Sequence, residues 1–169
     1  QKGFTMIELM VVFAIMVIMA ALIIISVDRA RSMSRDSTRT SEMKSLQQAL
    51  EGYYFENGSY PNVGWRCSSS EAGWQQGPLA EGLADFYDTL PVDPFNDGSN
   101  SDGERSTHGY HSYCYFTDAE ARWYMLVYTL ENRLPQTEAI DGVTDCAGST
   151  YDYGGDDGHI ITLGKNSCL

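Results

Sequence analysis

Four cysteines offer the most specific chemistry in this sequence. Cys67, Cys114, Cys146 and Cys168 all lie in the C-terminal two thirds of the chain, and an even number suits two disulfides in an exported domain. No two of them have the Cys-x-x-Cys spacing of zinc or redox sites. Three pairings are open. We favour Cys67–Cys114 together with Cys146–Cys168, which would close the C-terminal segment on itself.

A loop rich in Asp, Asn and Gly, residues 93–104, carries the side chains best suited to a cation. Carboxylate and amide oxygens on flexible backbone are the ligands that Ca²⁺ accepts, and here they belong to Asp93, Asp97, Asn100 and Asp102. Their spacing is not that of an EF-hand, and an acidic loop rich in Ser and Gly is more often simply a solvated surface. We expect no required cofactor, with calcium as the candidate ligand.

Catalytic motifs do not occur in the sequence. It contains no Gly-x-Ser-x-Gly, no His-Glu-x-x-His and no Gly-rich phosphate loop. Paired acidic residues are uninformative in a chain with a net charge of −12. The same balance argues against a basic nucleic-acid-binding domain, so we expect no specific nucleic-acid partner. We therefore expect a protein that is not an enzyme and has no catalytic residue.

Charge divides the 169 residues into three parts. Residues 4–27 contain one charge, Glu8, and residues 28–44 contain five cations and three anions. Residues 45–169 hold five cations and 19 anions. The sequence therefore predicts an apolar rod, a mixed-charge neck and an acidic head.

The apolar part, residues 4–27, predicts a transmembrane helix. It has no Pro, Gly, Lys or Arg, and as a helix it would be about 36 Å long, against roughly 30 Å for a bilayer core. Lys2 on the short N-terminal side favours a cytoplasmic N-terminus and an exported C-terminal domain. Glu8 is costly in such a helix and calls for a cation, from Lys2 or from another molecule. The alternative is a carboxylate that protonates or reaches the lipid headgroups.

The same helix is expected to continue through residues 28–55 as an amphipathic half. No Pro or Gly interrupts residues 4–51, whereas Gly58 and Pro61 supply a stop. Apolar residues recur at three- and four-residue spacing, which predicts one stripe laid on a globular domain. The stripe comprises Met33, Thr40, Met43, Leu46, Leu50, Tyr53 and Tyr54.

The remaining residues, 56–169, predict a small β-rich head. A helix is expected near 79–87, and strands at 109–116, 122–131 and 159–163, two of them with alternating Tyr and Leu. Their spacing favours an antiparallel sheet whose inner face covers the stripe of the long helix. The predicted fold class is α+β, one long N-terminal helix packed on a small antiparallel sheet.

The N-terminal segment Lys2-Gly3-Phe4-Thr5-Met6-Ile7-Glu8-Leu9-Met10 strongly resembles the processing site of type IV prepilins and prepilin-like proteins. The resemblance implies a type IV pilin fold, cleavage between Gly3 and Phe4 and N-methylation of Phe4. Residues 1–3 would then be a leader remnant. It also implies that Glu8 pairs with the terminal amine of an adjacent subunit during assembly. Residues 57–61 look like the helix exit of many pilins and of the major pseudopilin of type II secretion.

The function implied is that of a structural subunit of a type IV pilus-like helical filament, polymerised through the N-terminal helix. Its partners would be further copies of the chain, a prepilin peptidase and the pilus assembly machinery. The precursor would lie in the cytoplasmic or inner membrane and the mature chain in an extracellular filament.

Two alternatives remain. One is the major pseudopilin of a type II secretion system, because residues 90–95 are similar to its Leu-Pro-x-Asp-Pro-aromatic turn, which precedes a calcium loop. The cysteines favour a pilus instead, since major pseudopilins commonly lack disulfide bridges. The other is a single-pass membrane-anchored adhesin or receptor, in which Trp65, Trp74 and Trp123 could form a sugar platform rather than pack in a core.

Overall fold

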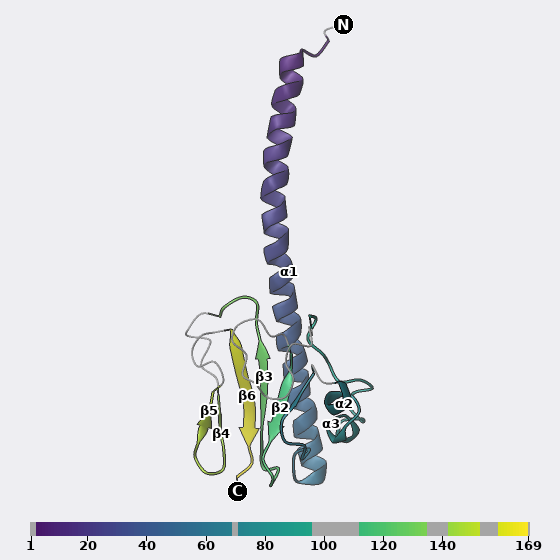
Figure 1. Ribbon diagram of the computed structural model, residues 1–169, viewed down its shortest axis with the longest axis vertical. Coiled ribbons are helices and arrows are strands. Elements are labelled where there is room, and N and C mark those ends of the chain that lie inside the picture. Colours follow the sequence, from purple (N-terminus) through teal and green to yellow (C-terminus); the bar gives the residue numbers. More distant parts are fainter. Residues whose placement is uncertain (1–2, 69–70, 96–111, 135–141, 153–158, 169) are drawn as a thin grey trace.

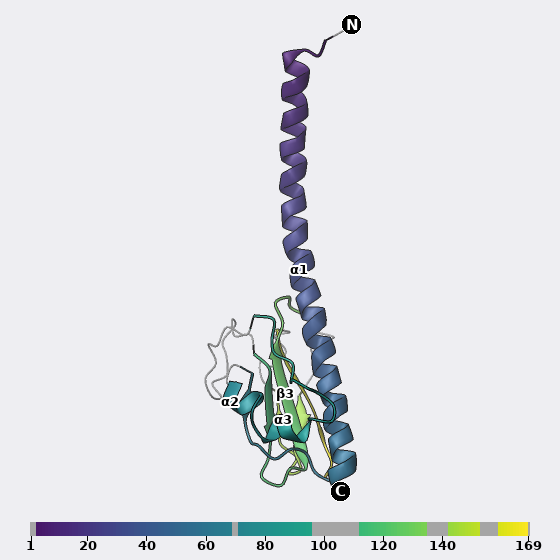
Figure 2. The same ribbon diagram turned by 90° about the vertical axis from the view of Figure 1, so that its right-hand side faces the viewer.

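One long helix and a small head make up the protein, as a computed structural model shows (Figures 1 and 2). Residues 3–68, 71–95, 112–134, 142–152 and 159–168 are described; for residues 22–26, 71 and 72 this covers the backbone only. The helix, α1 (Met6–Asn57), extends from the head as a rod, and its C-terminal half packs on an antiparallel sheet. The predicted α+β class and long-helix architecture are confirmed.

The helix α1 ends at the expected glycine. Gly58 adopts a left-handed conformation with φ of 70°, which costs other residues more, and its amide donates to the carbonyl of Tyr54 at 2.8 Å. The helix is thus three residues longer than its predicted end near Tyr54. Tyr60 then hydrogen bonds through its amide to the carbonyl of Ala121, which attaches the exit loop to the head.

Four strands form the main sheet in the order β1-β2-β3-β6, and every neighbouring pair is antiparallel. They are β1 (Arg66–Cys67), β2 (Cys114–Thr117), β3 (Trp123–Thr129) and β6 (Ile160–Asn166). A separate pair, β4 (Val143–Thr144) and β5 (Thr150–Tyr151), lies beside β6 (Figure 1). The expected strands at 122–131 and 159–163 correspond to β3 and β6. For the one expected at 109–116, residues 109–111 lie outside the described part.

The main core lies between α1 and one face of the sheet. From α1 it contains the buried Met43, Leu46 and Leu50, three residues of the predicted stripe. From the sheet it contains the alternating side chains that the sequence placed on one face. These are Tyr113, Tyr115, Tyr124, Leu126, Tyr128 and Leu130. Met33 departs from the expected stripe, because its side chain is 56% exposed.

The opposite face of the sheet is also covered. Trp123 and Met125 of β3 pack with Val143 of β4, and Trp65 and Phe116 lie against this second cluster. Trp74 is fully buried in the main core, where its indole donates to the carbonyl of Pro91 at 2.9 Å. Trp74 and Trp123 are therefore core residues and do not form a sugar platform.

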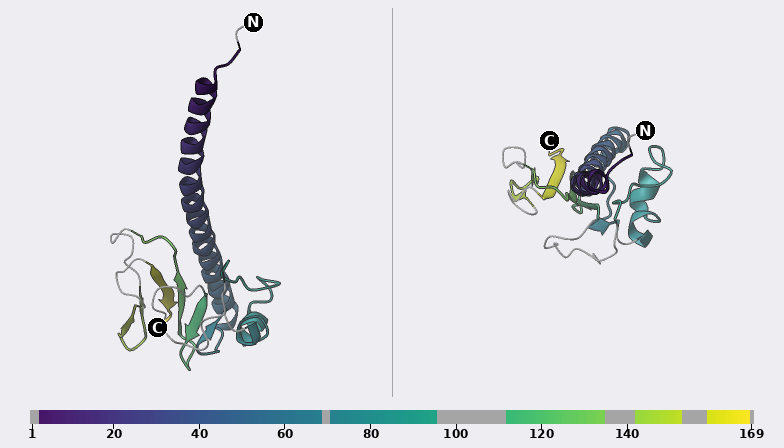
Figure 3. Two further views of the ribbon diagram at one scale, coloured as in Figure 1. Left: turned by 45° about the horizontal axis from the view of Figure 1, so that its top comes forward. Right: turned by 90° about the horizontal axis from the view of Figure 1, so that it is seen from above.

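Two short helices, α2 (Glu71–Trp74) and α3 (Pro78–Gly82), lie on the other side of α1 from β6 (Figure 3). The helix expected near 79–87 is shorter than predicted, since α3 stops at Gly82 and Leu83 leaves the helical conformation. Leu79 and Leu83 are nevertheless buried in the main core.

No helix among the described residues is both long enough and apolar enough to cross a bilayer. The predicted anchor, residues 4–27, includes the side chains of 22–26, which lie outside that description.

Candidate assembly site

The N-terminal tip of α1 is organised by a reciprocal cap between Thr5 and Glu8. The Glu8 carboxylate accepts hydrogen bonds at Oε2 from the Thr5 amide (2.8 Å) and the Thr5 hydroxyl (2.7 Å). The Thr5 hydroxyl oxygen accepts in turn from the Glu8 amide at 3.3 Å. This is a capping box, which satisfies two amides that a helix start leaves unpaired.

Sequence reasoning sought only a cation for Glu8 and missed Thr5 as its partner. The signal was present, because Thr-x-x-Glu before an apolar run is the pattern of a capping box. Glu8 therefore has an intramolecular partner in the single chain. Both bonds use Oε2, and among the described residues nothing donates to Oε1.

Gly3 and Phe4, the predicted processing residues, lie in the short extended segment before α1. A Cβ added at Gly3 would meet nothing within 4 Å, and the Phe4 side chain is 88% exposed. The proposed cleavage bond is therefore sterically open, whereas Lys2 lies outside the described residues. Processing and methylation stay predictions.

The first half of α1 presents a large apolar surface to its surroundings. From Phe4 to Met19, every large apolar side chain is at least half exposed. Exposed apolar surface of this extent marks an interaction site in a stable protein. The rod above the head is thus an uncovered face that either lipid or other helices must contact.

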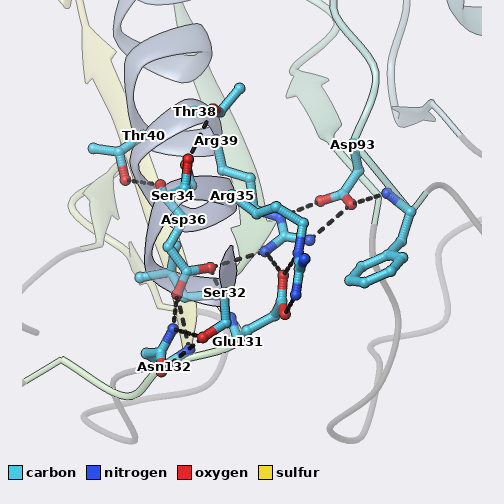
Figure 4. Close-up of polar contacts among 12 residues, drawn as sticks. Ser32, Ser34, Arg35, Asp36, Thr38, Arg39, Thr40, Asp93, Glu131 and Asn132 are labelled. Atoms are coloured by element: carbon cyan, nitrogen blue, oxygen red, sulfur yellow. Dashed lines mark hydrogen bonds and ion pairs between the residues drawn. The ribbon is translucent and has the colours of Figure 1, made fainter. Parts of the chain in front are cut away.

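A buried ionic cluster fixes α1 to the head where the rod leaves it (Figure 4). Arg39 is fully buried at its centre, and its Nε and Nη2 donate to the Asp93 carboxylate at 2.7 and 3.0 Å. Its Nη1 also donates to Asp36 at 2.8 Å and to Glu131 at 2.7 Å. We call Arg35, Asp36, Arg39, Asp93 and Glu131 the junction. Sequence reasoning did not find it.

Hydrogen bonds within the junction hold Glu131 and Arg39 in their charged forms. The hydrogen bond from Arg35 is the main cause that lowers the pKa of Glu131 to about 2, against its partial burial. Burial works to lower the pKa of Arg39, but hydrogen bonds to Asp93 and Glu131 outweigh it and raise the pKa. The guanidinium of Arg35 also lies 4.8 Å from the centroid of the Phe95 ring. Glu131 and Arg39 therefore stay ionised across the physiological pH range.

The predicted calcium ligands are only partly placed. Both oxygens of Asp93 are already used by Arg39, and Oδ1 also accepts from the Phe95 amide at 2.9 Å. Asp97, Asn100 and Asp102 lie outside the described residues. Within the described part, no group of three or more His, Cys, Asp or Glu could hold a metal ion. Calcium binding stays a prediction.

Two disulfides, Cys67–Cys114 and Cys146–Cys168, are present, and they are the pairs favoured from the sequence. The first joins residues directly opposite each other in β1 and β2. The second ties the segment after β4 to the chain end after β6, which closes the C-terminal part of the head on itself.

Residues 1–24 match the model of the prokaryotic N-terminal methylation motif. The chain is 30% identical over 97 residues to the type II secretion system core protein G of Pseudomonas aeruginosa, across 56% of this chain and 68% of that protein. The same protein of Escherichia coli is 28% identical over 97 residues, or 67% of its length. The type IV wide pilus major component PilA4 of Thermus thermophilus is 39% identical over 59 residues, covering 35% of this chain and 45% of that one. No solved structure matches.

A methylation motif at the start of a single long helix, followed by a small α+β head, defines a prepilin-like protein. The similarity to core protein G and to PilA4 narrows this class to one family. The chain belongs to the family of type IV pilins and type II secretion pseudopilins.

Proposed function

We propose that this chain is a structural subunit of a helical filament, built by packing the first half of α1 against the same segment of other copies. The observation that carries the proposal is the exposed apolar surface from Phe4 to Met19, with one carboxylate, Glu8, at its tip. Helix-to-helix packing removes that surface from lipid or water, and the heads then face outward. No chemical step is assigned to the chain itself.

Glu8 gives the assembly its register. A prepilin peptidase would cut between Gly3 and Phe4, and the new amine of Phe4 would be a cation at the helix tip. The free Oε1 of Glu8 in a neighbouring copy is suited to pair with it, while Oε2 keeps its bonds to Thr5. An unpaired carboxylate buried among apolar helices is costly, so the pair selects one axial position over others.

The filament is first proposed to be an extracellular pilus, with the precursor in the cytoplasmic or inner membrane. Two disulfides in the head suit an exposed surface filament. The second candidate is the major subunit of a type II secretion pseudopilus. It is favoured by the 97-residue similarity to core protein G, which is longer than the 59-residue similarity to PilA4.

The test is expression of the full chain with a prepilin peptidase and an assembly system, followed by shearing and mass spectrometry of the filaments. Filaments whose subunits begin at Phe4 support the proposal, and subunits that keep Gly3 in assembled filaments refute the processing step. Glu8→Val is expected to accumulate in the membrane yet assemble poorly. Glu120→Val, a change at an exposed position of the head, is the matched control and should assemble normally.

A further inference from the structure

A mostly apolar groove of about 600 Å³ lies beside α1 at the upper edge of the head. Its apolar lining includes the exposed Met33 and the side chains of Leu130 and Leu134, which follow β3. Lys44 and Arg133 also line it; both are exposed, and neither forms an ion pair with another described residue. We call this surface the basic groove. Asp36 lines the groove as well, but its two oxygens already accept hydrogen bonds, Oδ1 from Arg39 and the Glu131 amide and Oδ2 from Asn132. Lys44 and Arg133 are thus the charges of the groove that have no ion pair among the described residues, on a head whose net charge is negative.

A surface of the opposite character lies near the lower end of α1. Phe55 is 91% exposed and Phe86 is 43% exposed. Both lie near the same turn of α1. The Phe86 ring packs against Gly52 and fills the space that a Cβ at this position would take. Phe55 follows Gly52 by three residues and therefore lies on the same face of the helix. Exposed carboxylates flank the two rings. We call the whole surface the acidic knob: Phe55, Glu56, Asp85, Phe86 and Asp88.

The two surfaces cannot meet within one chain. The groove is formed with the segment after β3, whereas the knob is formed with the segment after α3, and α3 and β6 lie on opposite sides of α1 (Figure 3). Their α1 residues are also separated along the helix. The distance from the middle of residues 33–44 to Phe55 is about 25 Å at a rise of 1.5 Å per residue. Complementary patches that are displaced in this way form head-to-tail contacts, which continue as a helical polymer instead of closing a dimer.

We infer that the acidic knob of one subunit occupies the basic groove of a second copy of this chain. The inference rests on the proposed filament function and names the contact between heads. Phe55 and Phe86 would fill the apolar lining, where the flexible Met33 can adapt to them. Asp85, Asp88 and Glu56 would neutralise Lys44 and Arg133 at the rim, and such complementarity fixes which surfaces meet.

The apolar half of a neighbouring α1 is a poorer occupant of the groove. Residues 4–27 contain one charged side chain, and it is an acid at the tip. Laid in the groove, this segment would bury Lys44 and Arg133 against hydrocarbon without partners, which is costly for both cations. The charges therefore favour the knob.

The decisive experiment is a photo-cross-link within assembled filaments of the full chain. Phe86 is replaced by benzoylphenylalanine, the filaments are irradiated, and cross-linked peptides are identified by mass spectrometry. The expected product joins Phe86 to the peptide that contains Met33, in dimers and higher multimers. The same probe at Phe95, an equally exposed aromatic outside the knob, should not reach the groove.

A charge exchange provides the second, independent measurement. Lys44→Glu with Arg133→Glu is expected to lower the yield of sheared filaments at least fivefold, and Asp85→Lys with Asp88→Lys to do the same. The two pairs combined should restore the yield to within twofold of the wild type. Disulfide content and near-ultraviolet circular dichroism of each purified chain show whether its head has folded.

The outcomes separate this contact from filament formation itself. If the wild-type chain forms no filaments, the proposed function fails and the contact fails with it. If filaments form normally but the probe at Phe86 labels residues 4–27 or another part of the head, the contact alone is wrong. Failure of the combined charge exchange to restore a yield that each exchange lowers would also overturn it.

Discussion

Removing the guanidinium at the centre of the junction is expected to destabilise the head more than any surface change. In Arg39→Met, the fully buried Asp93 loses both charged hydrogen bonds, at 2.7 and 3.0 Å, and among the described residues it keeps the Phe95 amide as its donor. Glu131 still has Arg35 as a partner. Leaving one buried charge without its partner costs about 3–5 kcal/mol, and we expect a loss of free energy of unfolding in that range.

The assay is urea unfolding of the full chain in detergent at pH 7, followed by the fluorescence of the buried Trp74 and Trp123. With a slope of about 2 kcal/mol/M, a loss of about 4 kcal/mol lowers the urea midpoint by about 2 M. The matched control is Arg122→Met, whose ion pair with Glu120 is largely exposed. Breaking such a pair costs at most about 1 kcal/mol, or about 0.5 M.

A double-mutant cycle tests the assigned cause. If the cost comes from the stranded carboxylate, Arg39→Met combined with Asp93→Leu should be less harmful than the sum of the two single changes by at least about 2 kcal/mol. A wild-type midpoint for Arg39→Met would refute the reasoning. So would simple additivity, because the two side chains would then contribute independently.

Three further changes are measured in the same way. The lowered pKa of Glu131 means that its stabilising effect is complete above the unfolded value of 4.5 and is lost as the pH falls toward about 2. Glu131→Gln should therefore be less stable than the wild type at pH 6, by at most about 3 kcal/mol. This difference in the free energy of unfolding should begin to shrink below pH 4.5 and vanish near pH 2. In Gly164→Ala, the new Cβ would overlap the Tyr124 carbonyl oxygen, so β6 must shift, and the free energy of unfolding should fall by about 2–3 kcal/mol. An unchanged urea midpoint would show that β6 moves without cost. If the 93–104 loop binds calcium, a hundredfold excess over Kd adds about 2.7 kcal/mol, and Asp97→Ala with Asp102→Ala removes the gain; calcium-independent melting would contradict the prediction.

The helix and the longer strands could be predicted because their patterns repeat. α1 carries an unbroken run without Pro or Gly, and β3 alternates Tyr and Leu over its whole length, so the face of each element follows from periodicity. Strands of two residues, such as β1 and β4, have no periodicity to detect. Their positions depend on pairing with β2 and β5, which is tertiary information.

The candidate assembly site also has a part that the sequence predicts, the tip of α1, and a part that it does not, the junction. The tip of α1 is local in sequence, so its motif could be recognised, and the Thr5 cap of Glu8 could have been read from the same four residues. The junction is formed by residues far apart in the chain. Arg39 and Asp93 are separated by 54 positions and Arg35 and Glu131 by 96, so no spacing rule connects them. Asp93 was assigned to calcium because its acidic neighbours stand beside it in the sequence. Its actual partner, Arg39, lies beside it only in the folded chain.

The junction also determines how a force on the rod would reach the head. The apolar contact of α1 with the sheet begins at Met43, so the turns above it are held by Arg35, Asp36 and Arg39. Glu131 follows the last residue of β3 by two positions, and β3 is paired on both sides within the sheet. Tension along α1 therefore passes through the ion pairs to two places in the head: to Glu131, just after the fully paired β3, and to the segment that carries Asp93. A filament subunit needs this connection, because its helix and its head belong to different contacts of the same polymer.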